Sequence, residues 1–377
     1  MKIRKSNYKK SLPEIISFLV TNRCVCHCRH CFNWFEANPK GAIGNSKKLD
    51  LTADEISRIF SNLGPIEYLY VAGGEPFIRK DLCEVLQNIY EFSRPKTINI
   101  STNGQIIDNT IVTVDNFLKG HPEVRLIIKV SIDGIAEDHD AIRNTPGAFA
   151  RAISVYQSLM RLKDAHKKLK VGINTVFSSL NQDKIFDIYE YFCNLKPRPD
   201  CMAQLLVRDE PRDQQCKQGL KLDTYKRWTD LYVRDMVRGK FEHDSKVKIG
   251  TIMMYDYIYK TIIENKSKIP CYAGISGGFI DNEGMVGACE HTAPFGSLRE
   301  YDYDFKKIWN SDQAGKIREK IFDRCFCTNE PQWWHPTILY SKKISSHSIR
   351  LIKVIISVLA GKWFLQLKKE NISKSLI

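Results

Sequence analysis

The chain has 377 residues, 43% of them hydrophobic, which is enough to bury one large α/β domain and a smaller appended one. Lysine and arginine number 57 against 43 acidic residues, a net charge of +14, but much of the excess follows Tyr340 and argues only weakly for nucleic-acid binding. The basic N-terminus is not followed by the apolar stretch of a signal peptide, so the 12 cysteines are expected in a reducing compartment, where clustered thiols bind metal.

Apolar and β-branched runs alternate with stretches of helical periodicity over the first half of the chain. We predict strands over residues 14–21, 67–72, 97–101, 126–132, 170–176 and 203–207. A helix should begin at Thr52, where Thr52 and Glu55 form a capping box, and further helices are predicted over 81–92, 108–119, 149–167 and 183–193. Strands that alternate with helices form a parallel sheet, so six such units predict an α/β fold, a partial (β/α)6 TIM-like barrel.

Three cysteines with the spacing C-x3-C-x2-C follow the first predicted strand, at Cys24, Cys28 and Cys31. A four-iron cluster normally takes four thiolates, so three ligands on one tight loop leave one iron open to a reacting ligand. A zinc site is the alternative, since His27 and His30 lie between the cysteines and three thiolates with one imidazole bind zinc well. Cys26 breaks the spacing, and we expect a small buried thiol rather than a ligand.

Short polar motifs follow the next three predicted strands. Gly-Gly-Glu-Pro occupies 73–76, Ser-Thr-Asn-Gly occupies 101–104, and Ser-Ile-Asp-Gly occupies 131–134. In a barrel, the loops at the C-terminal ends of the strands build the active site. The motifs together indicate a ligand site at one rim, although each alone also suits an ordinary turn or helix cap.

The cysteine loop, Gly-Gly-Glu-Pro and Ser-Ile-Asp-Gly together resemble the radical S-adenosylmethionine (SAM) superfamily over roughly the first 210 residues. The resemblance implies that Cys24, Cys28 and Cys31 hold a [4Fe–4S] cluster whose open iron binds SAM. It also implies that SAM is cleaved to methionine and a 5′-deoxyadenosyl radical, which takes hydrogen from a substrate. The electron would come from a reducing partner such as flavodoxin or ferredoxin.

The same resemblance assigns SAM-binding roles to nine residues of this rim, namely Gly73, Gly74, Glu75, Pro76, Asn103, Ser131, Asp133, Arg143 and His30. Glu75 would face the ammonium group of methionine, and the planar guanidinium of Arg143 would pair with its carboxylate. His30 stands where the family often has an aromatic residue beside adenine. Phe32 is a second candidate for that apolar contact, although a core position is expected for it, and Arg143 could instead be a surface arginine. No catalytic acid or base is identified.

A second cysteine-rich segment follows a charged, helical stretch. Two apolar arms at 279–280 and 285–286 are joined by the turn 281–284, which predicts a β-hairpin with a cysteine near each end. This segment resembles the SPASM extension, or its shorter twitch form, and the resemblance implies one auxiliary [4Fe–4S] cluster with the ligands Cys271, Cys289, Cys325 and Cys327. A four-thiolate zinc site is an alternative, as is a cluster with an open iron that leaves Cys325 or Cys327 unused.

The predicted organisation is a basic tail (1–12), a radical SAM barrel (13–210), a helical connector (211–270), an auxiliary cluster domain (271–335) and a basic C-terminal helix (336–377). Arg350, Lys353 and Lys362 interrupt the apolar part of that helix, so it suits docking on the barrel or on an anionic membrane better than spanning one. We expect a cytoplasmic protein, either free or peripheral to the inner membrane face. The remaining thiols are expected to be inert: Cys83, Cys193, Cys201 and Cys216.

The predicted function is a radical SAM oxidoreductase or modifying enzyme that acts on a carbohydrate, a small alcohol or a peptide, with an auxiliary cluster that accepts or relays an electron. The nearest alternative is a peptide-modifying (RiPP maturase) radical SAM enzyme. A zinc-containing nucleic-acid-binding protein is a distant alternative, because it would leave the motifs at 73–76 and 131–134 unexplained. No nucleic-acid partner is therefore expected.

Overall fold

The computed structural model describes residues 12–33, 50–241, 243–266, 271–325 and 327–329. The chain divides into two units, the first made of Met1–Lys221 and Cys271–Cys325 and the second of Leu222–Pro270 and Phe326–Ile377. The predicted C-terminal helix at 336–377 and the basic tail up to residue 11 lie outside the described residues. Among the helices that are described, none has the length and hydropathy needed to cross a membrane.

Six parallel strands form the main sheet of the first unit in chain order, as the alternation of strands and helices predicts. They are β1 (Ile15–Thr21), β2 (Tyr68–Gly73), β3 (Thr97–Thr102), β4 (Arg125–Ser131), β5 (Leu169–Phe177) and β6 (Cys201–Leu206). Each begins and ends within two residues of its prediction, because the apolar runs that predicted the strands are the residues that become buried. The partial barrel is confirmed.

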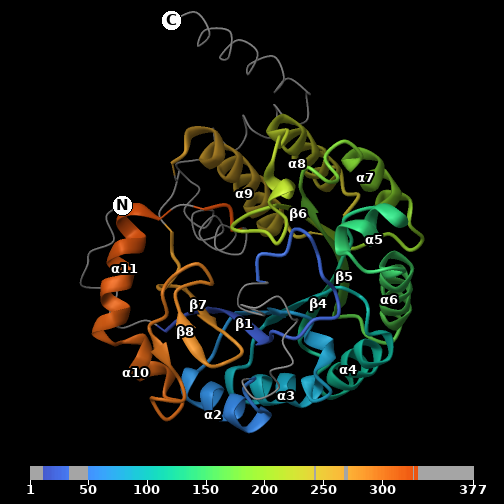
Figure 1. The fold of residues 1–377 in the computed structure, drawn as a ribbon. Helices are drawn as coiled ribbons and strands as arrows, with labels where there is room; N and C mark the ends of the chain where they lie inside the picture. The colour runs from blue at the N-terminus through green and yellow to red at the C-terminus, as the bar shows by residue number, and fades with distance from the viewer. Residues whose placement is uncertain (1–11, 34–49, 242, 267–270, 326, 330–377) are drawn as a thin grey trace, which may run out of the picture. The chain divides into compact units, whose positions relative to one another are not determined.

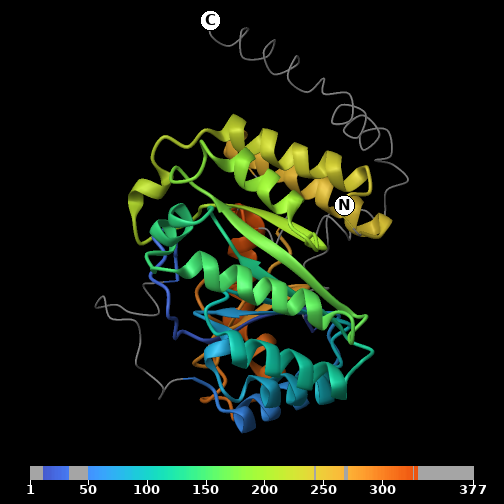
Figure 2. The ribbon, with the colours of Figure 1, turned by 90° about the vertical axis from the view of Figure 1, so that its right-hand side faces the viewer.

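Helices join the successive strands and cover the outer face of the sheet (Figure 1, Figure 2). They are α2 (Ala53–Leu63), the 3-10 turn η2 (Pro76–Ile78), α3 (Leu82–Ser93), α4 (Ile107–Gly120), α5 (Glu137–Arg143), α6 (Ala148–Leu162) and α7 (Ile185–Asn194). The capping box is confirmed, since Thr52 Oγ1 accepts the Glu55 N–H at 3.1 Å and Glu55 Oε2 accepts the Thr52 N–H at 2.8 Å. Helix α6 ends five residues before its predicted end, because residues 163–167 supply only Ala165 for an apolar face.

The two faces of the parallel sheet differ in chemistry. On β4, Leu126, Ile128 and Val130 are fully buried, whereas the alternate residues Lys129 and Ser131 face the interior of the barrel and are partly exposed. The C-terminal half of this inner face borders the cavity described below. The sheet therefore presents polar side chains where its strands end.

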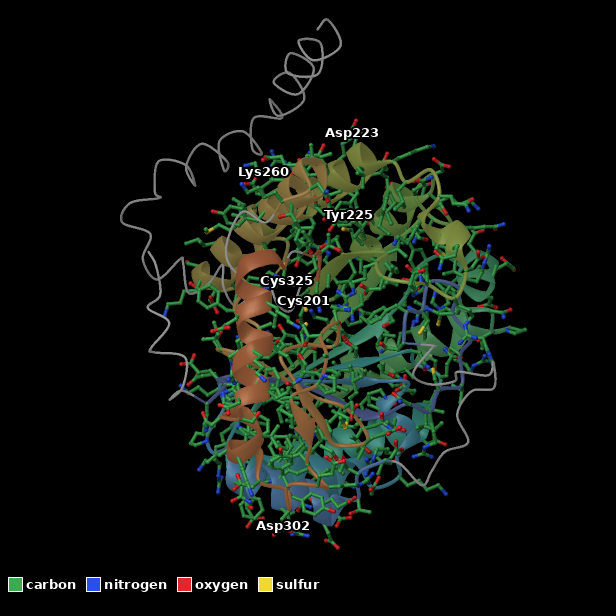
Figure 3. The ribbon with its side chains drawn as sticks, turned by 60° about the vertical axis from the view of Figure 1, so that its left-hand side comes forward. Cys201, Asp223, Tyr225, Lys260, Asp302 and Cys325 are labelled. Atoms are coloured by element: carbon green, nitrogen blue, oxygen red, sulfur yellow. The ribbon has the colours of Figure 1, made fainter. Side chains whose placement is uncertain are left out.

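The predicted β-hairpin extends the sheet beyond β1. Strands β7 (Gly277–Ile280) and β8 (Met285–Gly287) are antiparallel, with Phe279 opposite Gly287, so the hairpin is confirmed. Strand β7 also pairs in parallel with β1, with Ile15 beside Gly277. The short strand β9 (Gly296–Ser297) and helices α10 (Phe305–Trp309) and α11 (Asp312–Arg324) follow, and Cys325 comes directly after α11 (Figure 3).

Among its described residues, the second unit contains helices α8 (Leu222–Val237) and α9 (Ser245–Glu264), both within the predicted connector. The ring of Tyr232 on α8 lies edge-on to that of Tyr255 on α9, at 6.4 Å. The hydroxyl of Tyr259 donates to Asp223 Oδ1 at 3.1 Å, and Lys260 pairs with Asp256 at 2.7 Å; Asp223 and Lys260 are labelled in Figure 3. The Tyr232–Tyr255 and Tyr259–Asp223 contacts join the two helices, whereas the Lys260–Asp256 pair lies within α9.

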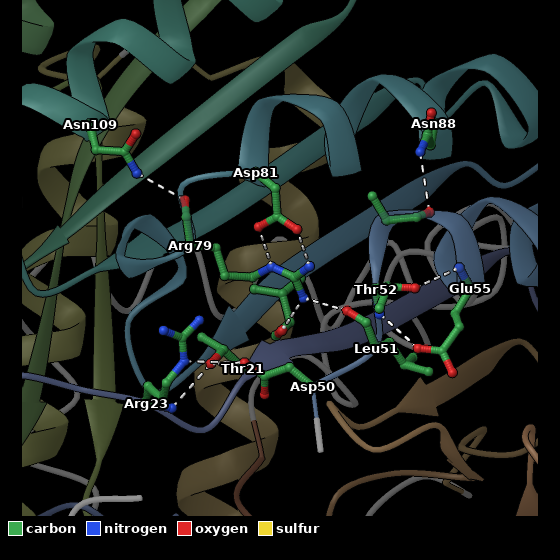
Figure 4. Close-up of polar contacts among 12 residues, drawn as sticks. Thr21, Arg23, Asp50, Leu51, Thr52, Glu55, Arg79, Asp81, Asn88 and Asn109 are labelled. Atoms are coloured by element: carbon green, nitrogen blue, oxygen red, sulfur yellow. Dashed lines mark hydrogen bonds and ion pairs between the residues drawn. The ribbon is translucent and has the colours of Figure 1, made fainter. Parts of the chain in front are cut away.

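A buried arginine ties together the segments around the end of β1 (Figure 4). Arg79 is 3% exposed, and its Nη1 donates to the carbonyl oxygens of Val20 at 2.8 Å and Leu51 at 2.9 Å. Its Nε and Nη2 donate to the two carboxylate oxygens of Asp81 at 3.0 and 2.6 Å. The guanidinium thus uses its planar fork on one carboxylate and two main-chain acceptors.

Beside this arginine, Asp50 connects β1 with the hairpin turn. Asp50 Oδ2 accepts the hydroxyl of Thr21 at 2.7 Å and pairs with Arg23 Nε at 3.3 Å. Asp50 Oδ1 accepts Nδ2 of Asn282 at 2.9 Å, and Asn282 belongs to the turn between β7 and β8. The start of the cysteine loop and the cysteine-rich hairpin therefore share one carboxylate.

Candidate functional site

The cysteine loop leaves the end of β1 and is fastened to α5. The main-chain N–H of His27 donates to the carbonyl of Arg143 at 3.2 Å, and that of Arg29 donates to Ile142 at 2.9 Å. These acceptors are among the last carbonyls of α5, which have no partner within the helix. The C-terminal end of α5 thus helps to set the conformation of the loop.

Gly73 and Gly74 lie against the start of the same loop. The N–H of Gly74 donates to the Thr21 carbonyl at 2.7 Å, and the N–H of Glu75 donates to the Arg23 carbonyl at 2.8 Å. A Cβ atom on Gly73 would lie 2.2 Å from the Thr21 oxygen, and one on Gly74 would lie 2.2 Å from the Arg23 oxygen. Both glycines therefore permit a close approach between main chains that a side chain would prevent.

Replacing Gly74 by alanine is expected to displace the cysteine loop, because the new methyl group cannot occupy the space of a carbonyl oxygen. We expect a loss of about 1–3 kcal/mol of stability and less iron bound after anaerobic reconstitution. Urea unfolding followed by circular dichroism, with iron counting, measures both effects. Gly120→Ala is the matched control, because nothing lies within 4 Å of its Cβ position. Equal iron content in the two variants would contradict the prediction.

Glu75 is fully buried and accepts three internal hydrogen bonds. Its carboxylate accepts the hydroxyl of Thr102 at 2.8 Å and the N–H groups of Asn103 at 2.6 Å and Phe77 at 3.2 Å. Burial raises the pKa of Glu75 to about 7, against the effect of these donors. The carboxylate joins the ends of β2 and β3, and its contact with the methionine ammonium stays a prediction.

A cavity of about 230 Å³ lies at the C-terminal ends of the parallel strands. Its lining includes most of the predicted site residues, namely Cys24, Cys28, Cys31, His30, Gly73, Gly74, Asn103, Ser131 and Arg143. Glu75, Pro76 and Asp133 are not among the lining residues. Phe32 borders the cavity and is partly exposed, so the expectation of a core position for Phe32 is wrong.

A buried ion pair stands beside the cysteine loop. Arg143 is 7% exposed, so the alternative of a surface arginine is wrong, and its Nη2 lies 2.6 Å from Asp133 Oδ2. Burial alone would raise the pKa of Asp133, but Arg143, His30 and His139 together with the Val176 N–H outweigh it and keep that pKa below its ordinary value. His30 Nε2 lies 3.7 Å from the same carboxylate oxygen. Asp133 therefore orients Arg143 and lies close to His30.

The four thiols of the loop differ in pKa. Cys26 is buried, as predicted, and its hydrogen bonds hold the pKa of Cys28 well below the ordinary thiol value. They also lower the pKa of Cys24, while the pKa of Cys26 itself is raised. Burial raises the pKa of Cys31 to about 12. Metal ligation requires thiolates, so each ligand thiol that carries a proton would lose it to a bound metal.

Arg208, which the sequence did not single out, contacts Phe32 beside the cavity. The guanidinium of Arg208, two residues after β6, lies 4.8 Å from the centre of the Phe32 ring. Arg208 Nη2 also donates to Glu290 Oε1 at 3.0 Å, and Glu290 directly follows Cys289. Arg208 therefore connects the first cysteine loop with the second cysteine-rich segment, and only its place after a strand end could have indicated it.

In the second segment, three of the predicted ligands belong to the first unit. A hydrogen bond with Cys271 lowers the pKa of Cys325 to about 7, against the effect of burial. Cys289 is buried after β8. Cys327 belongs to the second unit, where its Sγ accepts the N–H of Asn329 at 3.5 Å. The four-ligand set stays a prediction.

The first cysteine loop suits an iron–sulfur cluster with an additional ligand. Asn103 Nδ2 lies 3.5 Å from Cys24 Sγ, and Arg143 Nη1 lies 3.5 Å from Cys28 Sγ. Buried His30 Nδ1 and Arg143 Nε have no hydrogen-bond partner within the described residues, which suits a bound polar group. No three Cys, His, Asp or Glu residues of the described part converge on a single ion, and a four-iron cluster is wider than one ion.

Two family models match the chain. Residues 18–192 match the radical SAM superfamily, and residues 271–329 match SPASM, an iron–sulfur cluster-binding domain. A GTP 3′,8-cyclase of Aquifex aeolicus is 29% identical over 194 residues, 50% of this chain and 55% of that protein. An Fe-coproporphyrin III synthase of Methanosarcina barkeri is 26% identical over 349 residues, 84% of this chain and 81% of that protein. The chain spans about half the length of the first curated relatives that it matches.

Solved structures show the same fold. SuiB of Streptococcus suis matches with a TM-score of 0.56 and 16% identity, over 82% of this chain and 68% of that one. The structure of anSMEcpe with bound AdoMet matches with a TM-score of 0.58 and 15% identity, over 92% and 100% of the two chains. The two matched regions imply SAM with a [4Fe–4S] cluster in the first and auxiliary iron–sulfur binding in the second. Residues 18–192 therefore form a radical SAM region, and residues 271–329 form a SPASM iron–sulfur cluster-binding domain.

Proposed function

We propose that this enzyme cleaves SAM reductively at a [4Fe–4S] cluster held by Cys24, Cys28 and Cys31, and that the resulting 5′-deoxyadenosyl radical oxidises or modifies a substrate. One observation carries the proposal: separate loops after β1, β2 and β3, together with α5, contribute residues to one cavity. The three sulfurs would supply the ligands, and the open position would take SAM.

In this proposal, the rim residues orient SAM. Gly73 and Gly74 provide a main-chain edge at the cavity, while Asn103 and Ser131 offer short polar groups from neighbouring strands. Arg143 still has its Nε available for an acceptor, because only Nη1 and Nη2 have partners within the described residues. The predicted contact with the SAM carboxylate would use that atom.

Part of the cavity wall is apolar. This part includes Val176 at the end of β5, Leu205 and Leu206 at the end of β6, and Val207. Such a wall excludes water, which prevents side reactions of a reactive intermediate. A substrate would approach this wall near Phe32 and Arg208, which also border the cavity.

We propose a carbohydrate, a small alcohol or a peptide as substrate, with the auxiliary cluster accepting or relaying an electron. The peptide-modifying alternative remains a separate substrate class. The Fe-coproporphyrin III synthase, which aligns with most of this chain, adds a tetrapyrrole as a third candidate. A reducing partner such as flavodoxin or ferredoxin would supply the electron in a cytoplasmic setting, and the segment at 348–365 could bring the enzyme to a membrane surface.

Anaerobic purification and reconstitution, followed by iron and sulfide counting and incubation with dithionite and SAM, test the proposal. We expect a coloured iron–sulfur protein that forms 5′-deoxyadenosine, detected by liquid chromatography and mass spectrometry. A colourless zinc protein that never forms 5′-deoxyadenosine would overturn it. Repeating the reaction with candidate alcohols, peptides and tetrapyrroles deuterated at carbon then distinguishes the substrate classes, because only a substrate transfers its deuterium to 5′-deoxyadenosine.

A further inference from the structure

The guanidinium of Arg143 is directed at a cysteine sulfur. Its Nη1 lies 3.5 Å from Cys28 Sγ, and the side chain is 7% exposed. Cys28 is itself buried, at 8% exposed. A full positive charge next to a thiol in a buried environment interacts with it more strongly than the same pair in water.

The position of this guanidinium is fixed from the opposite side. Asp133 Oδ2 lies 2.6 Å from Arg143 Nη2, while Asp133 Oδ1 accepts the Val176 N–H at 2.8 Å. The main-chain N–H of Asp133 donates to His139 Nδ1 at 3.0 Å, and the residue is fully buried. Arg143 cannot move away from Cys28 without breaking a buried ion pair, which is costly.

The main chain of Arg143 also takes part. Its carbonyl accepts the N–H of His27, the residue before Cys28, at 3.2 Å. Arg143 therefore contacts the cysteine loop twice, through its main-chain carbonyl and through its guanidinium. This double attachment fixes the distance between the positive charge and the sulfur.

We infer that Arg143, held by Asp133, raises the reduction potential of the cluster at the first cysteine loop. Reduction adds one electron, which dithionite supplies in the test below, and neither makes nor breaks a bond. Hydrogen bonds to the cysteine sulfurs and nearby positive charge favour the more negative, reduced state. The inference rests on the proposed role of Cys28 as a ligand, and it assigns Arg143 an effect that does not require SAM.

A redox titration followed by electron paramagnetic resonance, on full-length reconstituted protein without SAM, tests the inference. The resonance signal that disappears when Cys24, Cys28 and Cys31 are replaced by alanine is assigned to the first cluster. For Arg143→Met we expect the ratio of reduced to oxidised cluster at a fixed potential to fall about tenfold, which is 59 mV for a one-electron couple. Arg143→Lys should restore most of the ratio, because it keeps the charge.

Arg29→Met is the matched control. Arg29 lies on the same loop and pairs with Asp213 at 2.7 Å, and its side chain is 33% exposed. Solvent screens its charge, so we expect less than about a twofold change in the ratio. If Arg143→Met cannot hold a cluster, Arg143→Gln removes the charge while keeping a donor, and should shift the ratio in the same direction.

The outcomes separate the two proposals. An unchanged potential in the neutral Arg143 variants, or an equal shift in Arg29→Met, would overturn the role of Arg143. If the potential stays unchanged while SAM binding weakens in equilibrium dialysis, Arg143 acts only on SAM. If Cys28→Ala loses neither iron nor signal, the proposed ligand set fails, and the inference fails with it.

Discussion

A variant in which Cys24, Cys28 and Cys31 are all alanine is expected to form no detectable 5′-deoxyadenosine, while it keeps about four irons per chain. The three thiols border one cavity and the loop that carries them is bonded to α5, and Cys26, the one thiol left in the loop, cannot supply three ligands. Iron and sulfide counting together with product analysis measure the two expectations independently.

Cys83→Ala is the control for this triple replacement. Cys83 lies on α3, is half-buried and is not among the lining residues of the cavity, so its loss should change neither iron content nor product. Product formation by the triple variant would contradict the proposed ligand set. Iron near zero would instead contradict a separate auxiliary cluster in the second cysteine-rich segment.

Replacing Arg79 by methionine is expected to cost about 3 kcal/mol of stability. Methionine has similar length but no donor, so the buried carbonyls of Val20 and Leu51 would lose their hydrogen bonds and Asp81 would lose its partner. This expected loss of stability is well below the summed free energies of the four hydrogen bonds, because Asp81 is 40% exposed and water can replace part of its pairing.

Anaerobic urea unfolding of SAM-free protein measures this loss, with the midpoint and slope followed by circular dichroism. Lys80→Met is the matched control, because Lys80 is the exposed neighbour in sequence and should change stability by less than about 0.5 kcal/mol. Equal midpoints for the two variants would show that the contacts of Arg79 do not stabilise the fold.

Local patterns predicted most of the fold. The strands could be found because their apolar runs are buried in the sheet, and α2 could be found because Thr52 and Glu55 cap each other. Helix α5 could not, since it has seven residues, no side-chain cap and Ala136 with a φ of 50° at its start. This helix bonds to the cysteine loop, which is distant in sequence, and a local sequence pattern does not encode such contacts.

The composition of the cavity could be predicted better than its contacts. Parallel strands bring their C-terminal ends to one edge, so motifs far apart in sequence were expected to meet. The atoms that each side chain faces depend on packing, as Glu75 illustrates by accepting from Thr102 and Asn103. Arg208 has no motif of its own, and only its neighbours Phe32 and Glu290 reveal it.

The pairing of β1 with β7 has a consequence during synthesis. Residues 15–18 of β1 cannot pair with β7 until residues 277–280 have been synthesised. At roughly 5–20 residues per second, a ribosome needs tens of seconds to reach them. Until then, β1 would form an uncovered edge of the nascent sheet, and such edges attract other chains. A growing chain of this enzyme would therefore be most prone to aggregate before its second cysteine segment emerges, which gives that segment a protective task separate from any metal it binds.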